Sequence, residues 1–294
     1  MGRPALTHER THEMRKKCIA VTVCLLMAVF LYAAYQVWVQ GREYLQSNTA
    51  YTKLDEFVSI SSTETAAGFA TPSAIPPSAA TPLPASTPLP EKEYDYPDII
   101  WPEVDFERLR EINPEIVGWL FLEGSEINYP VAQADDNAKY LNYLFDGTKN
   151  KAGCPFLDAE NAGDFSDWHS IIYAHNRKDG SMFGGLSKFK KQSYYDEHPR
   201  FLLITETARY VVEIFSGHVA RSDSGAWKTA FQDEEEFDAW REVIQERSSI
   251  ETEVAPDQGE RILTLSTCSY EFDNARYVLH GVLRKARMPE ESTE

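Results

Sequence analysis

The stretch that decides the fold reads RILTLSTC at residues 261–268, and RYVLHGVL follows it at residues 276–283. Both runs are apolar and rich in residues that favour strands, and the polar residues between them favour a turn. The sequence therefore predicts a β-hairpin in which Cys268 ends one strand and Arg276 begins the next. This spacing would bring the thiol beside the guanidinium.

A second apolar run, SIIYAHN at residues 170–176, brings His175 to the end of another predicted strand. A thiol can attack a carbonyl group, an imidazole can move the proton, and a guanidinium can stabilise the negative charge that develops. We therefore expect an enzyme with Cys268 as the nucleophile and His175 as the general acid. Arg276 would donate to the oxyanion or hold the substrate backbone.

Cysteine usage supports a single reactive thiol. Cys18 and Cys24 fall within an N-terminal hydrophobic segment, so only Cys154 and Cys268 belong to the rest of the chain. Two thiols are too few for a disulfide scaffold. A buried free cysteine is often an inert small hydrophobe, which is the competing interpretation of Cys268. Its position between an apolar run and a polar stretch, close to Arg276, favours an accessible thiolate.

The hydrophobic segment runs from Cys18 to Val39 without a charged residue. At 1.5 Å per residue, its 22 positions would form a helix about 33 Å long, enough to cross a bilayer core. A cleaved signal peptide is the alternative, but its apolar region is usually shorter. Because Arg10, Arg15, Lys16 and Lys17 precede the segment, the positive-inside rule predicts a cytoplasmic N-terminus and an exported remainder.

The acidity of the chain lies in the part after residue 17. The net charge is −17, yet the first 17 residues hold five of the 29 Lys and Arg residues and only two of the 46 Asp and Glu residues. The remainder therefore carries −20. This balance disfavours nucleic acid and anionic lipid as partners and is compatible with a basic, amine-bearing partner.

Composition divides the chain into four parts. Residues 61–97 hold eight of the sixteen prolines among many Ser, Thr and Ala residues, which indicates an extended spacer. The predicted parts are a cytoplasmic tail (1–17), a transmembrane signal anchor (18–39), an extracytoplasmic stalk (40–97) and a catalytic domain (98–294).

The predicted catalytic domain is mainly β. Helical spacing is confined to residues 105–112, 136–144 and 234–247, and short β-prone runs fill the rest. Eight short strands with few helices predict a closed β-barrel with peripheral helices. The expected strands are 117–122, 127–131, 154–157, 170–174, 200–205, 209–220, 261–267 and 277–283.

Six motifs, taken in order, resemble the class B sortases of Gram-positive bacteria. They are VDFERLREINPEIVGWL, NYPVAQADDNAKYLNYLFDG, KAGCPFLDAEN, IIYAHNRKDGSMFGGL, LTLSTCSYEF and ARYVLHGVL, spread over roughly residues 104–285. The resemblance implies a sortase-type eight-stranded barrel. It also implies a cysteine transpeptidase that cuts the sorting signal of a secreted surface protein after threonine and joins the new carboxyl end to an amine. That amine would belong to a peptidoglycan cross-bridge or a pilin.

The same resemblance assigns residues to roles. The catalytic trio would be His175, Cys268 and Arg276, and the positions lining the substrate groove would be Asn137, Leu141, Tyr173, Trp227, Thr229 and Ser266. Two features depart from the family pattern, namely Cys154, where serine is more frequent, and the stretch AWKTAF at residues 226–231. We expect neither a cofactor nor a metal ion, and a membrane contact only through the N-terminal helix.

Two other functions stay open. Water can also resolve a thioester, so the chain could be an exported cysteine endopeptidase that only hydrolyses. It could instead be a non-catalytic surface-binding barrel in which Cys268 is structural.

Three further patterns are given structural interpretations. HERTH at residues 8–12 matches the HExxH pattern of zinc proteases but lies in a short tail with no folded core around it. His218 and His280 lie inside strand patterns, and we expect both to be structural. We expect a solvated acidic loop, rather than a cation site, from Asp158, Glu160, Asp164 and Asp167.

Overall fold

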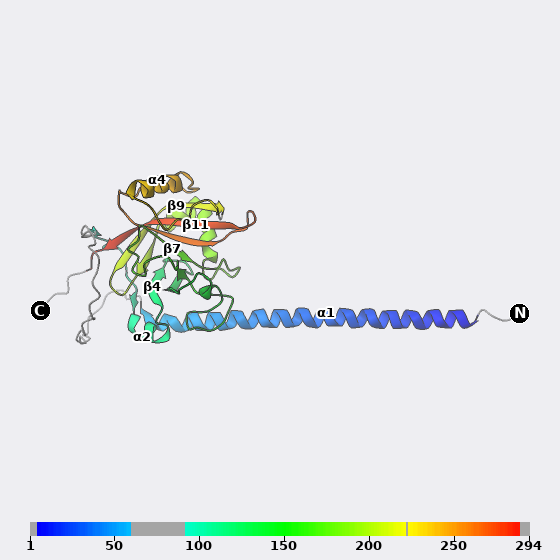
Figure 1. Ribbon diagram of the computed structural model, residues 1–294. Coiled ribbons are helices and arrows are strands. Elements are labelled where there is room, and N and C mark those ends of the chain that lie inside the picture. The colour runs from blue at the N-terminus through cyan, green and yellow to red at the C-terminus, as the bar shows by residue number, and fades with distance from the viewer. Residues whose placement is uncertain (1–4, 60–91, 222, 289–294) are drawn as a thin grey trace. The chain divides into compact units, whose positions relative to one another are not determined.

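The computed structural model describes residues 5–59, 92–221 and 223–288 (Figure 1). They fall into two compact units, one that ends at Thr49 and one that begins at Ala50. The first unit consists of most of helix α1 (Ala5–Leu54), which contains the predicted hydrophobic segment. Within the described residues, α1 is the one helix long and apolar enough to cross a membrane. The predicted spacer lies for the most part in residues 60–91, outside the described residues.

The second unit is built around a closed β-barrel of eight strands. Pairing of β10 with β11 joins the two ends of the strand order and closes the barrel, which confirms the predicted fold. Two neighbouring pairs, β7–β10 and β5–β6, are parallel. The strands in order of adjacency are β10 (Ile262–Cys268), β7 (His169–Tyr173), β6 (Phe156–Leu157), β5 (Asn128–Ala132), β4 (Ile116–Phe121), β8 (Arg200–Ile204), β9 (Arg209–Arg221) and β11 (Ala275–Ala286).

Three short strands lie at the margins of the barrel. Strand β2 (Glu93–Tyr94) pairs in parallel with the end of β11, and β1 (Val58–Ser59) pairs with β3 (Glu103–Val104). Just before β1, Leu54 and Phe57 are buried in a core cluster of the second unit, and the Tyr51 hydroxyl donates a hydrogen bond to the Gly153 carbonyl at 2.7 Å. The chain from residue 50 onward therefore packs with the barrel.

The peripheral helices begin where side chains cap them. Asp105 accepts a hydrogen bond from the Arg108 amide at the start of α2 (Phe106–Ile112), and Asp233 accepts one from the Glu236 amide at the start of α4 (Glu234–Glu246). Sequence spacing predicts an apolar face of Phe237, Trp240, Val243 and Ile244; α4 buries all of these except Val243, which is 41% exposed. The remaining short elements are η1 (Asp55–Phe57), η3 (Gly184–Lys190) and α3 (Gln192–Glu197).

The helix expected at residues 136–144 is wrong, because only one 3-10 turn, η2 (Lys139–Leu141), forms there. The Asp136 carboxylate accepts hydrogen bonds from the amides of Ala138 and Lys139, both at 2.8 Å. The carbonyl of Tyr140 bonds to the Cys154 amide, and the carbonyl of Leu141 bonds to a histidine ring. These competing bonds replace the helical i→i+4 bonds. The Leu141 carbonyl therefore accepts no helical hydrogen bond and can accept one from the histidine ring.

Candidate active site

The predicted hairpin places Cys268 and Arg276 directly opposite each other. They are paired in the register between β10 and β11, at the end of that ladder next to the connecting loop. The side chains of β10 are buried up to Thr267, whereas Cys268 is only partly buried. The thiol therefore sits where the strand leaves the barrel interior.

The neighbours of His175 and Cys268 hold the two strand ends together. Strands β7 and β10 run parallel, with Tyr173 paired to Ser266, so the residues that follow emerge side by side. The Thr267 hydroxyl donates to the carbonyl of Ala174 at 2.8 Å, and the Asn176 amide donates to the carbonyl of Cys268 at 2.6 Å. Each catalytic candidate is thus flanked by a residue that bonds to the other strand end.

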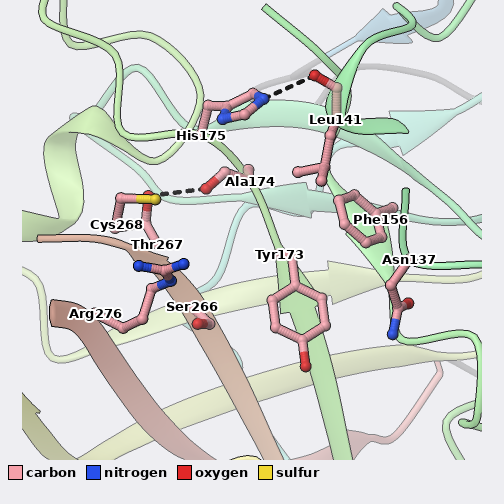
Figure 2. A pocket seen from close by; sticks show the side chains of 10 residues that line it. All are labelled: Asn137, Leu141, Phe156, Tyr173, Ala174, His175, Ser266, Thr267, Cys268 and Arg276. Carbon is pink, nitrogen blue, oxygen red and sulfur yellow. Dashed lines mark hydrogen bonds between the residues drawn. The ribbon is translucent and has the colours of Figure 1, made fainter. Parts of the chain in front are cut away.

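The ring of His175 has a defined tautomer. Its Nε2 lies 2.8 Å from the carbonyl oxygen of Leu141 (Figure 2). A carbonyl oxygen only accepts hydrogen bonds, so Nε2 carries a hydrogen and Nδ1 is the nitrogen that gains or loses a proton. The Leu141 carbonyl at the end of η2 therefore orients the imidazole.

A pocket of about 410 Å³ brings most of the predicted residues together (Figure 2). Seven of them line it: Asn137, Leu141, Tyr173, His175, Ser266, Cys268 and Arg276. Phe156, Ala174 and Thr267 complete the wall; sequence analysis did not single them out. Ala174 and Thr267 directly precede His175 and Cys268, and this adjacency was the one available sign of their position.

Trp227 and Thr229 do not line this pocket. The Trp227 indole donates a hydrogen bond to the Ser266 hydroxyl at 2.9 Å, so it supports a wall residue. The Thr229 hydroxyl donates to the Glu160 carboxylate at 3.2 Å. Neither residue therefore forms part of the pocket wall.

Arg276 is available to an anion. Its guanidinium donates to the carbonyl of Ala275 at 3.1 Å, and within the described residues it has no carboxylate partner at ion-pair distance. Figure 2 shows it on the same side of the pocket as Cys268. A guanidinium in this position can stabilise negative charge that forms on a carbonyl attacked by the thiol.

Asp158 is the residue whose surroundings differ most from expectation. The sequence predicts a solvated acidic loop here, but Asp158 is buried, with a relative exposure of 6%. It accepts hydrogen bonds from the Tyr173 hydroxyl at 2.8 Å and the Asn137 amide at 3.1 Å. Burial, followed by the nearby Asp158 carboxylate, raises the pKa of Tyr173, so this hydroxyl keeps its proton.

Cys154 and three buried histidines are poor candidates for the chemistry. Cys154 is buried among apolar groups, and burial raises the pKa of its thiol to about 12. Burial lowers the pKa of both His169 and His218 to about 4, and it lowers that of His280. These rings are neutral and enclosed near pH 7, in agreement with the structural role expected of His218 and His280. In the described parts of the chain, no three His, Cys, Asp or Glu side chains gather to hold a metal ion.

Curated relatives of this chain are sortases. No family model matches the chain. Sortase B of Listeria monocytogenes is 35% identical over 177 residues, which cover 60% of this chain and 72% of that protein. Sortase B of Staphylococcus aureus is 32% identical over 163 residues, which cover 55% of this chain and 67% of that protein.

Solved structures agree with the sequence comparison. The structure described as a Staphylococcus aureus sortase B–substrate complex superimposes with a TM-score of 0.59 at 30% identity, covering 62% of this chain and 85% of that one. A Bacillus anthracis protein described as similar to sortase B gives a TM-score of 0.58 at 36% identity, covering 62% and 83%. The similarity spans most of the length of each solved chain.

Proposed function

Because the chain belongs to the sortase B family and is a cysteine transpeptidase, we propose that it cleaves a threonine-containing C-terminal sorting signal of surface proteins and links the acyl-enzyme to a cell-wall or pilin amine. The observation that carries this proposal is the pocket that Cys268, His175 and Arg276 line together. A nucleophile, a proton donor and a cation around one cavity are the parts that acyl transfer needs.

In the first half-reaction, the Cys268 thiolate attacks the carbonyl carbon of the threonine. The carbonyl oxygen becomes an oxyanion, which Arg276 stabilises. When the intermediate collapses, the carbon–nitrogen bond breaks and the imidazolium of His175 gives its Nδ1 proton to the leaving amine. Nδ1 has this role because the Leu141 carbonyl already occupies Nε2. The products are a thioester on Cys268 and a free amine that departs.

In the second half-reaction, an acceptor amine attacks the thioester. The neutral His175 takes a proton from the attacking nitrogen, the carbon–sulfur bond breaks, and Cys268 leaves as the thiolate. An amide bond now joins the sorted protein to its acceptor. Water in place of the amine would give hydrolysis, so the acceptor decides between a transpeptidase and an endopeptidase.

The remaining features suit a site at the cell surface. Helix α1 is compatible with a single-pass membrane anchor, and sortases are cell-surface enzymes. The basic residues that precede the apolar segment favour an N-terminus in the cytoplasm and a catalytic domain outside. The exported part is strongly acidic, which would attract a positively charged amine acceptor.

A peptide assay tests the proposal. Full-length protein in detergent is incubated with a threonine-containing sorting peptide, with and without an added amine, and the products are identified by mass spectrometry. We expect cleavage after threonine and incorporation of the amine, and no product from the matched Cys268→Ala protein. Cleavage in which added amine never enters the product would support the endopeptidase instead. Failure of Cys268 to react with a thiol probe in the folded protein would support the non-catalytic barrel.

A further inference from the structure

Asp158 is a buried acid that the mechanism above does not use. It directly follows β6, and its backbone amide donates to the Ile171 carbonyl of β7 at 2.8 Å. Its own carbonyl accepts a hydrogen bond from the Gln133 side chain at 2.9 Å. The backbone therefore fixes this residue behind the pocket wall, close to the strand that carries Tyr173.

All the side-chain contacts of Asp158 are hydrogen bonds that it accepts. Oδ2 accepts from the Tyr173 hydroxyl and the Asn137 Nδ2, and Oδ1 accepts from the Glu160 amide at 2.9 Å. The orientation of Asn137 is fixed a second time, because its Oδ1 accepts from the Ala159 amide at 2.8 Å. In Figure 2 the Tyr173 hydroxyl and the Asn137 amide point to the same side of the pocket.

We propose that Asp158 is a positioning residue that sets the hydrogen-bond polarity of this wall of the substrate groove; the proposal rests on the function proposed above, in which the pocket holds a peptide. The Tyr173 hydroxyl donates its one hydrogen bond to Asp158, so its oxygen offers the pocket only lone pairs. Asn137 uses one N–H on Asp158 and keeps the other. The wall thus presents one acceptor and one donor, which match the N–H and the C=O of a peptide unit.

The substitution Asp158→Asn tests this polarity with almost no change of volume. A carboxamide has one accepting oxygen and one donating nitrogen, whereas three donors face the Asp158 carboxylate from two sides. If its oxygen faces Tyr173 and Asn137, its NH₂ group meets the Glu160 amide. If it is turned round, the NH₂ group meets the two pocket residues. Either orientation loses hydrogen bonds, and a residue acting through the wall should weaken peptide binding rather than the chemical step.

Asp167 supplies the matched control. Its carboxylate accepts hydrogen bonds from the Asn161 side chain at 2.9 Å and the Ala162 amide at 2.7 Å, but it does not line the pocket. Asp167→Asn therefore removes a partly buried carboxylate acceptor from the same loop without touching Tyr173 or Asn137. A purely structural role of these carboxylates would give the same result for both variants.

The experiment measures KM and kcat of the full-length protein with the sorting peptide and, separately, protection of Cys268 from iodoacetamide by that peptide. The protection constant is the peptide concentration that halves the rate at which iodoacetamide modifies Cys268. For Asp158→Asn we expect KM and the protection constant to rise about tenfold, the effect of one lost hydrogen bond to a charged group. We expect kcat to change less than about threefold. Asp167→Asn should leave both constants near wild type. Asp158→Glu, which keeps the carboxylate but displaces it by one methylene, should also raise KM, and it replaces Asp158→Asn if that variant does not fold.

A double-mutant comparison separates positioning from general destabilisation. In a Tyr173→Phe/Asn137→Ala background, Asp158→Asn should raise the protection constant by less than about twofold, because the groups it positions are already gone. An unchanged protection constant in the single variant, or an equal rise in that background, would overturn the proposal. A wild-type protein that binds the peptide but never turns it over would contradict the proposed function and leave the binding comparison valid.

Discussion

Asn176→Ala removes one of the side-chain hydrogen bonds that hold the ends of β7 and β10 together. The lost bond runs from Asn176 Nδ2 to the carbonyl oxygen of Cys268, at 2.6 Å. A typical hydrogen bond contributes about 1 kcal/mol net, so we expect the free energy of unfolding to fall by about that amount. The effect on activity should be larger than this loss of stability suggests, because the bond is attached to the nucleophile itself.

The expected loss of activity follows from geometry. A misplacement of about 1 Å between reacting groups can cost about 100-fold in rate. The Thr267–Ala174 bond remains in Asn176→Ala and limits the displacement, so we expect kcat to fall about tenfold with KM within about twofold. Thr267→Val removes the Thr267–Ala174 side-chain bond as well. The double variant should lose more than the product of the two single effects, because either bond alone still holds the strand ends.

Steady-state peptide kinetics and urea unfolding of the same preparations provide the measurement. Asn128→Ala is the matched control, because it removes an asparagine that accepts a hydrogen bond from Trp119 at 2.7 Å and does not line the pocket. It should lose stability comparable to that of Asn176→Ala without losing kcat. If Asn176→Ala retains the wild-type kcat, or if the control loses kcat equally, the two bonds do not position the catalytic pair.

Three further outcomes are expected. Arg276→Lys should lower kcat/KM nearly as much as Arg276→Ala, on the order of 100-fold or more, because lysine lacks the planar fork of donors; a lysine variant with near wild-type kcat/KM would argue against an oxyanion role. In folded protein near neutral pH, iodoacetamide should modify Cys268 and spare Cys154, whose pKa burial raises to about 12; peptide mapping that finds label on Cys154 would contradict this assignment. The free energy of unfolding should fall as the pH drops from 6.5 to about 4, because the folded-state pKa of His169 and His218 is lowered to about 4 and the unfolded chain binds protons first. The loss is on the order of 3 kcal/mol for each histidine, measured by urea unfolding across this range, and it should shrink in His169→Gln and His218→Gln; equal pH slopes in wild type and variants would exclude these histidines as its source.

The barrel strands and the catalytic hairpin were predictable because their signals are local. The run expected at residues 261–267 forms β10 (Ile262–Cys268), and the run expected at 209–220 forms β9 (Arg209–Arg221). Alternating or continuous apolar residues bounded by turn residues are enough to locate such strands. The polar gap after Cys268 also fixed its pairing with Arg276.

The parts that could not be predicted depend on contacts between distant segments. The bond from Asn176 to Cys268 joins residues 92 positions apart, and the one from His175 to Leu141 joins residues 34 positions apart. The second contact is one reason why residues 136–144 do not form the expected helix. The burial of Asp158 likewise depends on Tyr173 and Asn137, which flank it in space but not in sequence. Local composition carries no sign of such partners.

The order of strands around the barrel also determines when the enzyme becomes active. Strand β10 belongs to the last hairpin of the chain, yet it must insert between β7 and β11 to complete the ring. Contacts of such large sequence separation form slowly, because a long loop must be closed before they contribute. A nascent chain still being synthesised therefore contains His175 before it contains Cys268. Cys268 meets His175 and Arg276 only once β10 has paired with both β7 and β11, so a copy in which this hairpin has not inserted lacks the proposed catalytic site.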